Sequence, residues 1–365
     1  MKKHQGAIVM GFCLVFGLGI GFVFAQDLKS ESIFKKWFKE QDKILIDTSG
    51  LSVSALREIH VRPEGNIVFL DPRAGCLFEF DSSGKFIRKI GGRGQGPGEF
   101  MMPIAACLDF AGHLYVADSK TRRVSIFNQD GSFVSSFIHA ANHGYPSIMR
   151  TDSHRNLFLE VLALPPEGRI MPDWFYKYSA NGRALGSFFE AGTDTDWILS
   201  MYPRFAFDLS GDTIYAMQIH AYEINLIDAD GKLLKTIGEP PDYWVKPEFK
   251  NRISGRSFRS QTELVDLLTG LSKSWTRIIK LQVIEGKYIV VMTLANGLVR
   301  GIEETYLLDI WTIEGRKVVT GIPSPYALLC SDAKGNCYFL LDSTEETALD
   351  EDPKYTIGKF KIDAD

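Results

Sequence analysis

The stretch Ile90–Phe137 reads IGGRGQGPGEFMMPIAACLDFAGHLYVADSKTRRVSIFNQDGSFVSSF and alternates between a glycine-rich link and short apolar blocks. Such blocks, rich in β-branched and aromatic residues and separated by turn residues, indicate β-strands. The segment GHLYVAD within it resembles the earlier GNIVFLD, and their first glycines, Gly112 and Gly65, are 47 positions apart. A segment that recurs at this spacing is typical of a repeat fold.

The same cycle recurs along the rest of the chain. Looser copies of the apolar block read RNLFLEV, GDTIYAM, GKYIVVM and GNCYFLL, which makes six units in all. The tetrads DSSG, NQDG, SANG and DADG follow the blocks and are typical of hairpin turns, because Asn, Asp and Gly tolerate positive φ. Units of four short antiparallel strands at about 40–50 residues indicate the blades of a β-propeller. We therefore predict an all-β, six-bladed propeller of four-stranded antiparallel blades.

The last unit is one strand short at the end of the chain. Upstream of the first unit, KILIDTS at Lys43–Ser49 reads as a strand without a partner. Pairing this N-terminal strand with the last blade would close the ring and remove its exposed edges. We therefore expect the two ends of the propeller to meet in one sheet.

One stretch, at about residues 240–275, interrupts the repeat. It contains SQTELVDLLTGLSKSW, with leucines at helical spacing at 264, 267, 268 and 271. We predict a helical insertion between blades 4 and 5. It is either a connector packed for stability or a lid or partner-binding element, since long insertions often carry function.

The first 25 residues have the features of a signal peptide. Lys2 and Lys3 precede the apolar run Ala7–Phe24, and small residues precede a cleavage site after Ala25. A retained membrane anchor is the alternative, because the run reaches about 18 residues. We expect cleavage, a periplasmic or secreted protein with no membrane span after it, a linker at 26–42 and a propeller at 43–365.

The composition is that of an ordinary globular protein. Of the 365 residues, 45% are hydrophobic and 24% charged, and the formal net charge is −4. No block of Lys and Arg provides a basic surface, so we expect no nucleic-acid partner.

Four cysteines remain after signal cleavage, namely Cys76, Cys107, Cys330 and Cys337. A turn at Asp332–Gly335 would place Cys330 opposite Cys337 on neighbouring antiparallel strands, close enough for a disulfide. Oxidising conditions outside the cytoplasm permit such a bond, and two buried thiols are the alternative. The cysteines show no C-x2-C spacing, so a zinc site is not indicated.

The stretch from Ile90 to Phe137 resembles the NHL-type repeat of six-bladed β-propellers, especially the secreted propellers of bacteria. The resemblance extends loosely over about 320 residues. It implies that the glycine-rich link joins one blade to the next and that an aspartate and an arginine hold the turns together. In this sequence those structural roles fall on Gly94, Gly98, Phe100, Pro103, Asp118 and Arg123. Relatives of this kind include amidating lyases, lactonase-like hydrolases with a central metal, and binding modules, so the fold does not select a function.

Motifs for catalysis are missing from the sequence. The link GGRGQGPGEF lacks the third glycine of G-x-G-x-x-G, and a strand pattern rather than a helix follows it. No G-x-S-x-G pentad occurs. His139 and His143 have an i, i+4 spacing, but they lie in a loop region without H-E-x-x-H. We predict no metal and no cofactor, and the catalytic residues of any enzyme are unknown.

Two groups of side chains are candidates for ligand binding. The first is a mixed-charge rim at the ends of the second strands and in the link, comprising Asp71, Arg73, Arg93, Asp118, Lys120 and Arg122. The alternative is that the aspartates accept backbone hydrogen bonds in their turns and Arg123 pairs with a neighbour. The second group consists of Trp174, Tyr243 and Trp244, aromatic residues flanked by prolines and charges that are candidates for exposed contacts.

These observations favour an exported, monomeric, non-enzymatic propeller that binds a protein, peptide or glycan on one face. The alternative is a metal-assisted lyase or lactonase-like hydrolase with its site at the central channel, and only this alternative calls for Ca²⁺ or Zn²⁺. An enzyme of that kind needs several Asp, Glu, Asn or His side chains that converge near the axis.

Overall fold

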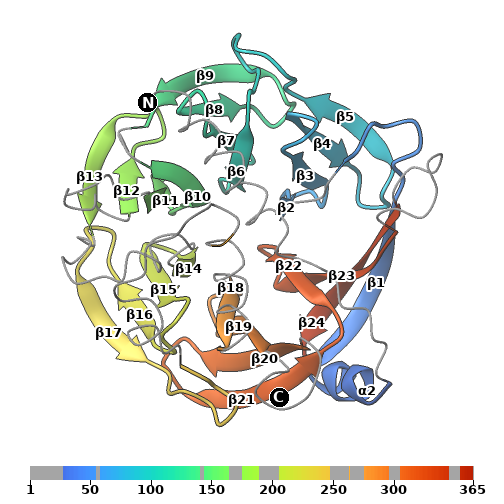
Figure 1. Ribbon diagram of the computed structural model, residues 1–365, viewed down its shortest axis with the longest axis vertical. Coiled ribbons are helices and arrows are strands. Elements are labelled where there is room, and N and C mark those ends of the chain that lie inside the picture. Colours follow the sequence, from blue (N-terminus) through green and yellow to red (C-terminus); the bar gives the residue numbers. More distant parts are fainter. Residues whose placement is uncertain are drawn as a thin grey trace.

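Six four-stranded antiparallel sheets surround a central axis in the computed structural model of the protein (Figure 1). The structure describes residues 28–54, 58–139, 144–163, 175–188, 205–246, 263, 275–295, 305–344 and 354–364. The first strand of each blade lies nearest the axis and the fourth lies at the rim. The prediction of a six-bladed β-propeller is confirmed.

The blades follow one another along the chain. Blade 1 comprises β2 (Glu58–Val61), β3 (Ile67–Asp71), β4 (Cys76–Phe80) and β5 (Phe86–Ile90). Blade 2 comprises β6 (Pro103–Leu108), β7 (Leu114–Asp118), β8 (Arg123–Phe127) and β9 (Phe133–Ile138). Blade 3 comprises β10 (Gly144–Thr151), β11 (Leu157–Ala163), β12 (Phe175–Tyr178) and β13 (Ala184–Phe188).

The second half of the ring repeats this order until the last sheet. Blade 4 comprises β14 (Phe205–Ser210), β15 (Thr213–Gln218), β16 (Ile224–Ile227) and β17 (Leu233–Ile237). Blade 5 comprises β18 (Arg277–Ile284), β19 (Tyr288–Ala295), β20 (Thr305–Thr312) and β21 (Lys317–Ser324). Blade 6 comprises β22 (Ala327–Ser331), β23 (Asn336–Thr344), β24 (Lys354–Ile362) and the N-terminal strand β1 (Phe38–Ile46).

The hydrophobic core is divided into six layers, each between two neighbouring blades. The layer between blades 1 and 2 shows the pattern, since Val68 and Leu70 of β3 meet Val116 of β7 and Phe127 of β8. All five residues of β3 and of β7 are buried. This explains why those segments read as continuous apolar runs, because a central strand of a blade is covered on both faces.

The ring closes through β1, which pairs antiparallel with β24 from Phe38↔Ile362 to Ile46↔Tyr355. The expected strand at Lys43–Ser49 is therefore longer than predicted and begins at Phe38. The predicted linker at 26–42 is wrong from residue 28 onward, because α2 (Leu28–Trp37) leads directly into β1. Phe34 of this helix is fully buried, with its ring 5.0 Å from that of Phe339 and 5.2 Å from that of Phe360.

Several predicted segments lie outside the described residues. They are the signal peptide at 1–25 and most of the insertion at about 240–275, of which only 240–246, 263 and 275 are described. Within the part of the chain that is described, no helix has the length and apolar character that crossing a membrane requires.

The glycine-rich link carries the chain from the rim strand β5 to the axial strand β6. Its two arms are joined by hydrogen bonds from Phe100 N–H to Gly92 O (2.7 Å) and from Gly94 N–H to Phe100 O (3.0 Å). Phe100 is fully buried between blades 1 and 2. Gly98 has φ of +74°, and a Cβ there would lie 3.2 Å from Phe133 Cβ, so a side chain at this position is both strained and crowded.

We expect Gly98→Ala to lower the free energy of unfolding by about 1–2 kcal/mol, the cost of a left-handed conformation for an L-residue. Gly92→Ala is the matched control, because the φ of Gly92 is not in the left-handed range and a Cβ added there would have no atom within 4 Å. Urea unfolding of both variants measures the difference. Equal stability of the two variants would contradict this account of the link.

The expected alignment of Cys330 with Cys337 is incorrect. The turn is one residue longer than expected, because Asp332 N–H donates to Asn336 O, and this register pairs Cys330 with Tyr338 and Cys337 with Ser331. Cys330 therefore packs in the layer between blades 6 and 1, whereas Cys337 packs in the layer between blades 5 and 6. Since their side chains lie on opposite faces of one sheet, both cysteines are buried free thiols.

Candidate ligand-binding site

The two predicted rim aspartates are buried at the ends of β3 and β7. Asp118 Oδ1 accepts the N–H groups of Lys120 (2.9 Å) and Thr121 (2.8 Å), and its Oδ2 accepts those of Met101 (2.6 Å) and Met102 (2.8 Å). Asp71 binds its own turn and Ser54 in the same way. Each carboxylate therefore joins the turn after a second strand to the segment that leads into the blade, which is a structural role.

The basic residues of the predicted rim are exposed and lie around these turns. Arg73, Arg93, Lys120 and Arg122 all have exposed side chains, and Arg93 Nη2 donates to Arg73 O at 2.6 Å. Arg123 Nη1 donates to Gln95 O at 3.0 Å, and this bond ties β8 to the glycine-rich link. Pro103 is buried as the first residue of β6, opposite Asp118.

The predicted aromatic contacts are not exposed where the structure describes them. Tyr243 is buried, and its hydroxyl donates to the buried carboxylate of Asp309, which also accepts from Tyr222. Trp244 is half-buried against Tyr222, with ring centroids 5.3 Å apart. Burial and the neighbouring Asp309 carboxylate raise the pKa of Tyr243 well above its ordinary value. Trp174 lies outside the described residues.

A different feature of the described structure is a cavity of about 1110 Å³ at the axis. First strands of all six blades line it, together with the turns between first and second strands. The predicted rim lies around the turns between second and third strands, which are at the opposite ends of these antiparallel strands. None of the eight predicted ligand-binding residues that the structure describes lines the cavity. Its polar wall includes Glu58, His60, Arg150, Asp208, Lys280 and Gln282.

An ion pair between blades 3 and 4 forms one side of the cavity wall. Arg150 Nε lies 3.0 Å from Asp208 Oδ1, and both side chains are less than one-fifth exposed. Asp208 Oδ2 also accepts the N–H of Val283 at 2.9 Å, so this carboxylate connects blades 3, 4 and 5. Both oxygens of Asp208 are thus already bound.

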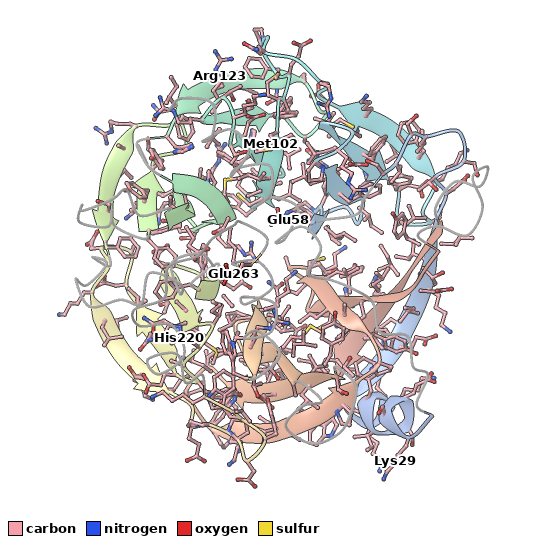
Figure 2. All side chains as sticks on the ribbon, in the orientation of Figure 1. Lys29, Glu58, Met102, Arg123, His220 and Glu263 are labelled. Carbon is pink, nitrogen blue, oxygen red and sulfur yellow. The ribbon has the colours of Figure 1, made fainter. Side chains whose placement is uncertain are left out.

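Glu58 lies on the other side of the cavity, at the start of β2 and close to the axis (Figure 2). Its Oε2 accepts the N–H of Ala106 at 2.7 Å and lies 3.8 Å from His60 Nε2. Burial opposes ionisation of this carboxyl, but the His60 imidazole and the Ala106 N–H outweigh it. The pKa of Glu58 therefore lies below its ordinary value, and the group is a carboxylate at neutral pH.

Lys280 of β18 is another cation of the cavity lining. Its ammonium donates to the carbonyl oxygen of Leu329 in the neighbouring blade 6. Burial and the charge of Arg150 lower the pKa of Lys280 from its ordinary value. Cys330 lies nearby, and burial raises the pKa of its thiol to about 12, so the thiol is protonated and inert at neutral pH.

The mouth of the cavity combines an exposed aromatic ring with turn carboxylates. Phe110 is 66% exposed at the tip of the first turn of blade 2. Asp152, His154 and Asp212 form the only group among the described residues whose ligand atoms are close enough to share a metal ion. Asp152 already accepts from His154 N–H and from the backbone and side chain of Asn156, so its oxygens are committed to the turn.

Sequence reasoning missed the cavity residues, although the pattern contains a signal for them. In EIHV, SIMRT, AFDLS and IKLQV, a charged or amide residue stands beside a buried apolar one, namely Ile59, Met149, Phe207 or Leu281. Alternation in an inner strand, where second strands such as β3 and β7 are continuous apolar runs, indicates a strand with one side open. An alignment of the six repeats on their first strands would have predicted that these polar residues surround the axis together.

The six sheets around one axis, the sequence repeat and the pairing of β1 with β24 define this protein as a six-bladed β-propeller. A family model described as 6-bladed beta-propeller (DUF5128) matches residues 45–158. Over part of its length the chain is similar to NHL-like six-bladed propellers. It is 29% identical to human NHL repeat-containing protein 3 over 126 residues, which are 31% of this chain and 36% of the relative. It is 36% identical to the lin-41 protein of Caenorhabditis elegans over 66 residues, 18% of this chain and 6% of that protein.

The chain thus spans about a third or less of the length of these curated relatives. Two solved structures are similar to it over nearly their full length. A Bacteroides fragilis protein described as exported has a TM-score of 0.61 at 13% identity, covering 90% of this chain and 96% of that one. A member of the DUF4221 family from Bacteroides vulgatus has a TM-score of 0.65 at 11% identity, covering 90% and 98%. At these identities the likeness shows the fold alone.

Proposed function

We propose that this protein is an exported binding module that holds a peptide or glycan segment in the axial cavity. The cavity is the main support for the proposal, because its volume of about 1110 Å³ is slightly above the usual range of ligand pockets and leaves room for a peptide or glycan segment. Its wall offers cationic, anionic and amide groups, and Phe110 offers an apolar surface at the mouth. Export rests on the N-terminal sequence.

The state of the carboxylates favours binding over metal-assisted catalysis. A metal centre at the axis needs several unbound oxygen or nitrogen ligands that converge on one point. Asp208 uses both oxygens within the protein, and Glu58 is paired with His60 and a backbone N–H. These groups orient the cavity wall and supply its polarity.

Peptide and glycan arrays probed with the full chain test this function. We expect saturable binding to a subset of ligands, and we expect Phe110→Ala to weaken that binding about fivefold or more, because an exposed aromatic at a binding site is a typical hot spot. Val134→Ala is the control, since Val134 is 49% exposed on the rim strand β9, far from the cavity lining.

Mass spectrometry of the recovered ligand distinguishes binding from catalysis. Recovery of an unchanged ligand supports a binding module, whereas conversion to a cleaved product would establish the lyase or hydrolase alternative. Binding that is unaffected by Phe110→Ala would place the ligand elsewhere on the propeller.

A further inference from the structure

Lys280, a cation of the axial cavity, has fewer hydrogen-bond and ion-pair partners than the carboxylates Glu58 and Asp208. Lys280 carries three N–H donors, and the acceptor found for them is the carbonyl oxygen of Leu329. No carboxylate of the described residues forms an ion pair with this ammonium. A carbonyl oxygen compensates a buried positive charge less well than a carboxylate does.

A second cation stands in the same cavity. Arg150 binds Asp208 through Nε and donates to Met149 O through Nη1 at 2.8 Å. Arg150 lines the same cavity as Glu58 and Lys280, and its charge lowers the pKa of both of these groups. Two like charges in a partly desolvated space repel each other, and an anion bound to both would relieve that repulsion.

The two carboxylates on the inner strands of the cavity do not meet this demand. Glu58 is bound by Ala106 N–H and faces His60, while Asp208 is bound by Arg150 and by Val283 N–H. Each of them therefore already has a backbone donor and a basic side chain. Among the described residues, no carboxylate forms a direct ion pair with Lys280, and the charges of Glu58 and Asp208 only partly oppose the lowering of its pKa.

We infer that the cavity binds its ligand through a carboxylate that pairs with Lys280 and Arg150. This inference rests on the proposed function and specifies the chemistry of the ligand. A carboxylate of this kind occurs on an acidic sugar or on an acidic amino acid, and the test separates these two sources.

Isothermal titration calorimetry of the full chain with two charged probes and their neutral counterparts tests the inference. Glucuronate is compared with glucose, and N-acetylglutamate with N-acetylglutamine. We expect at least one carboxylate probe to bind about tenfold or more tightly than its neutral partner, as a charge-assisted hydrogen bond allows. The probe that shows the preference identifies the source of the carboxylate.

Substitution then assigns the preference to one residue. We expect Lys280→Met to abolish the preference for the carboxylate and Lys280→Arg to retain it. Lys317→Met is the matched control, because Lys317 is an exposed lysine of the same blade and pairs with Glu239 at 3.0 Å. Circular dichroism shows whether each variant folds. If a variant does not fold, the comparison of charged and neutral probes on the unaltered chain still tests the inference.

Three results would overturn the inference: equal affinity for charged and neutral probes, an undiminished preference in Lys280→Met, or no binding of any of the four probes. Array ligands that bind in a Phe110-dependent manner without a carboxylate would leave the proposed function standing and remove only this inference. A lack of any array ligand would remove the proposed function itself.

Discussion

Glu79→Ala is expected to lower the free energy of unfolding by about 3–5 kcal/mol, because it leaves a buried arginine without its partner. Glu79 and Arg62 are both fully buried, and Arg62 Nε lies 3.0 Å from Glu79 Oε1. Glu79 also pairs with Arg88 Nε at 3.1 Å and accepts from Asn66 Nδ2 at 3.0 Å. Arg62 in turn donates to Gly112 O of blade 2, so the network joins two blades.

Urea unfolding measures this loss against Glu64→Ala, which removes an exposed glutamate from the neighbouring turn and is expected to change stability by less than about 0.5 kcal/mol. The double variant Arg62→Met/Glu79→Leu should recover much of the lost stability, because it removes both charges and restores apolar packing. A single variant Glu79→Ala as stable as the unaltered chain would show that the network does not hold blades 1 and 2 together.

Phe38→Ala is expected to cost about 3–5 kcal/mol, the usual range for removing a buried phenylalanine ring. Phe38 is fully buried at the start of β1, and its ring lies 4.8 Å from that of Phe34 and 5.3 Å from that of Phe339. The substitution loosens the strand that closes the ring, so the loss should be accompanied by faster hydrogen exchange along β1 and β24.

Leu45→Ala is the matched control for ring closure. Leu45 lies on the same strand but is 58% exposed, so its truncation is expected to change stability by less than about 0.5 kcal/mol. Equal losses from Phe38→Ala and Leu45→Ala would mean that the layer between blades 5 and 6 does not depend on the N-terminal segment.

Only part of the candidate site could be predicted from the sequence. Asp71 and Asp118 stand out because they follow apolar strands, and the alternative structural interpretation of them matches the bonds they make. Tyr243 and Trp244 looked exposed because prolines and charges flank them. Their burial depends on Asp309 and Tyr222, which are distant in sequence and meet them only when blades 4 and 5 pack together.

The disulfide expectation failed for a similar reason. The turn contains Asp332–Gly335 as expected, but Asp332 N–H donates to Asn336 O, so the turn is one residue longer than expected. The longer turn shifts the pairing of the two strands by one residue, and a shift of one turns a side chain to the other face of a strand. The spacing of two cysteines in the sequence does not fix how many residues the turn between them takes up.

Local patterns in the chain specify the repeat, the number of blades and the strand that closes the ring, because alternation, apolar runs and glycine turns act within each unit. The packing of the blades specifies which side chains meet at the axis, since Glu58, Arg150, Asp208 and Lys280 come from four different blades. Their proximity arises from closing the ring, and no local pattern records the distances across it. The same closure converts α2 and the start of β1 from an expected linker into part of the core, because Phe34 and Phe38 find their partners only in blade 6.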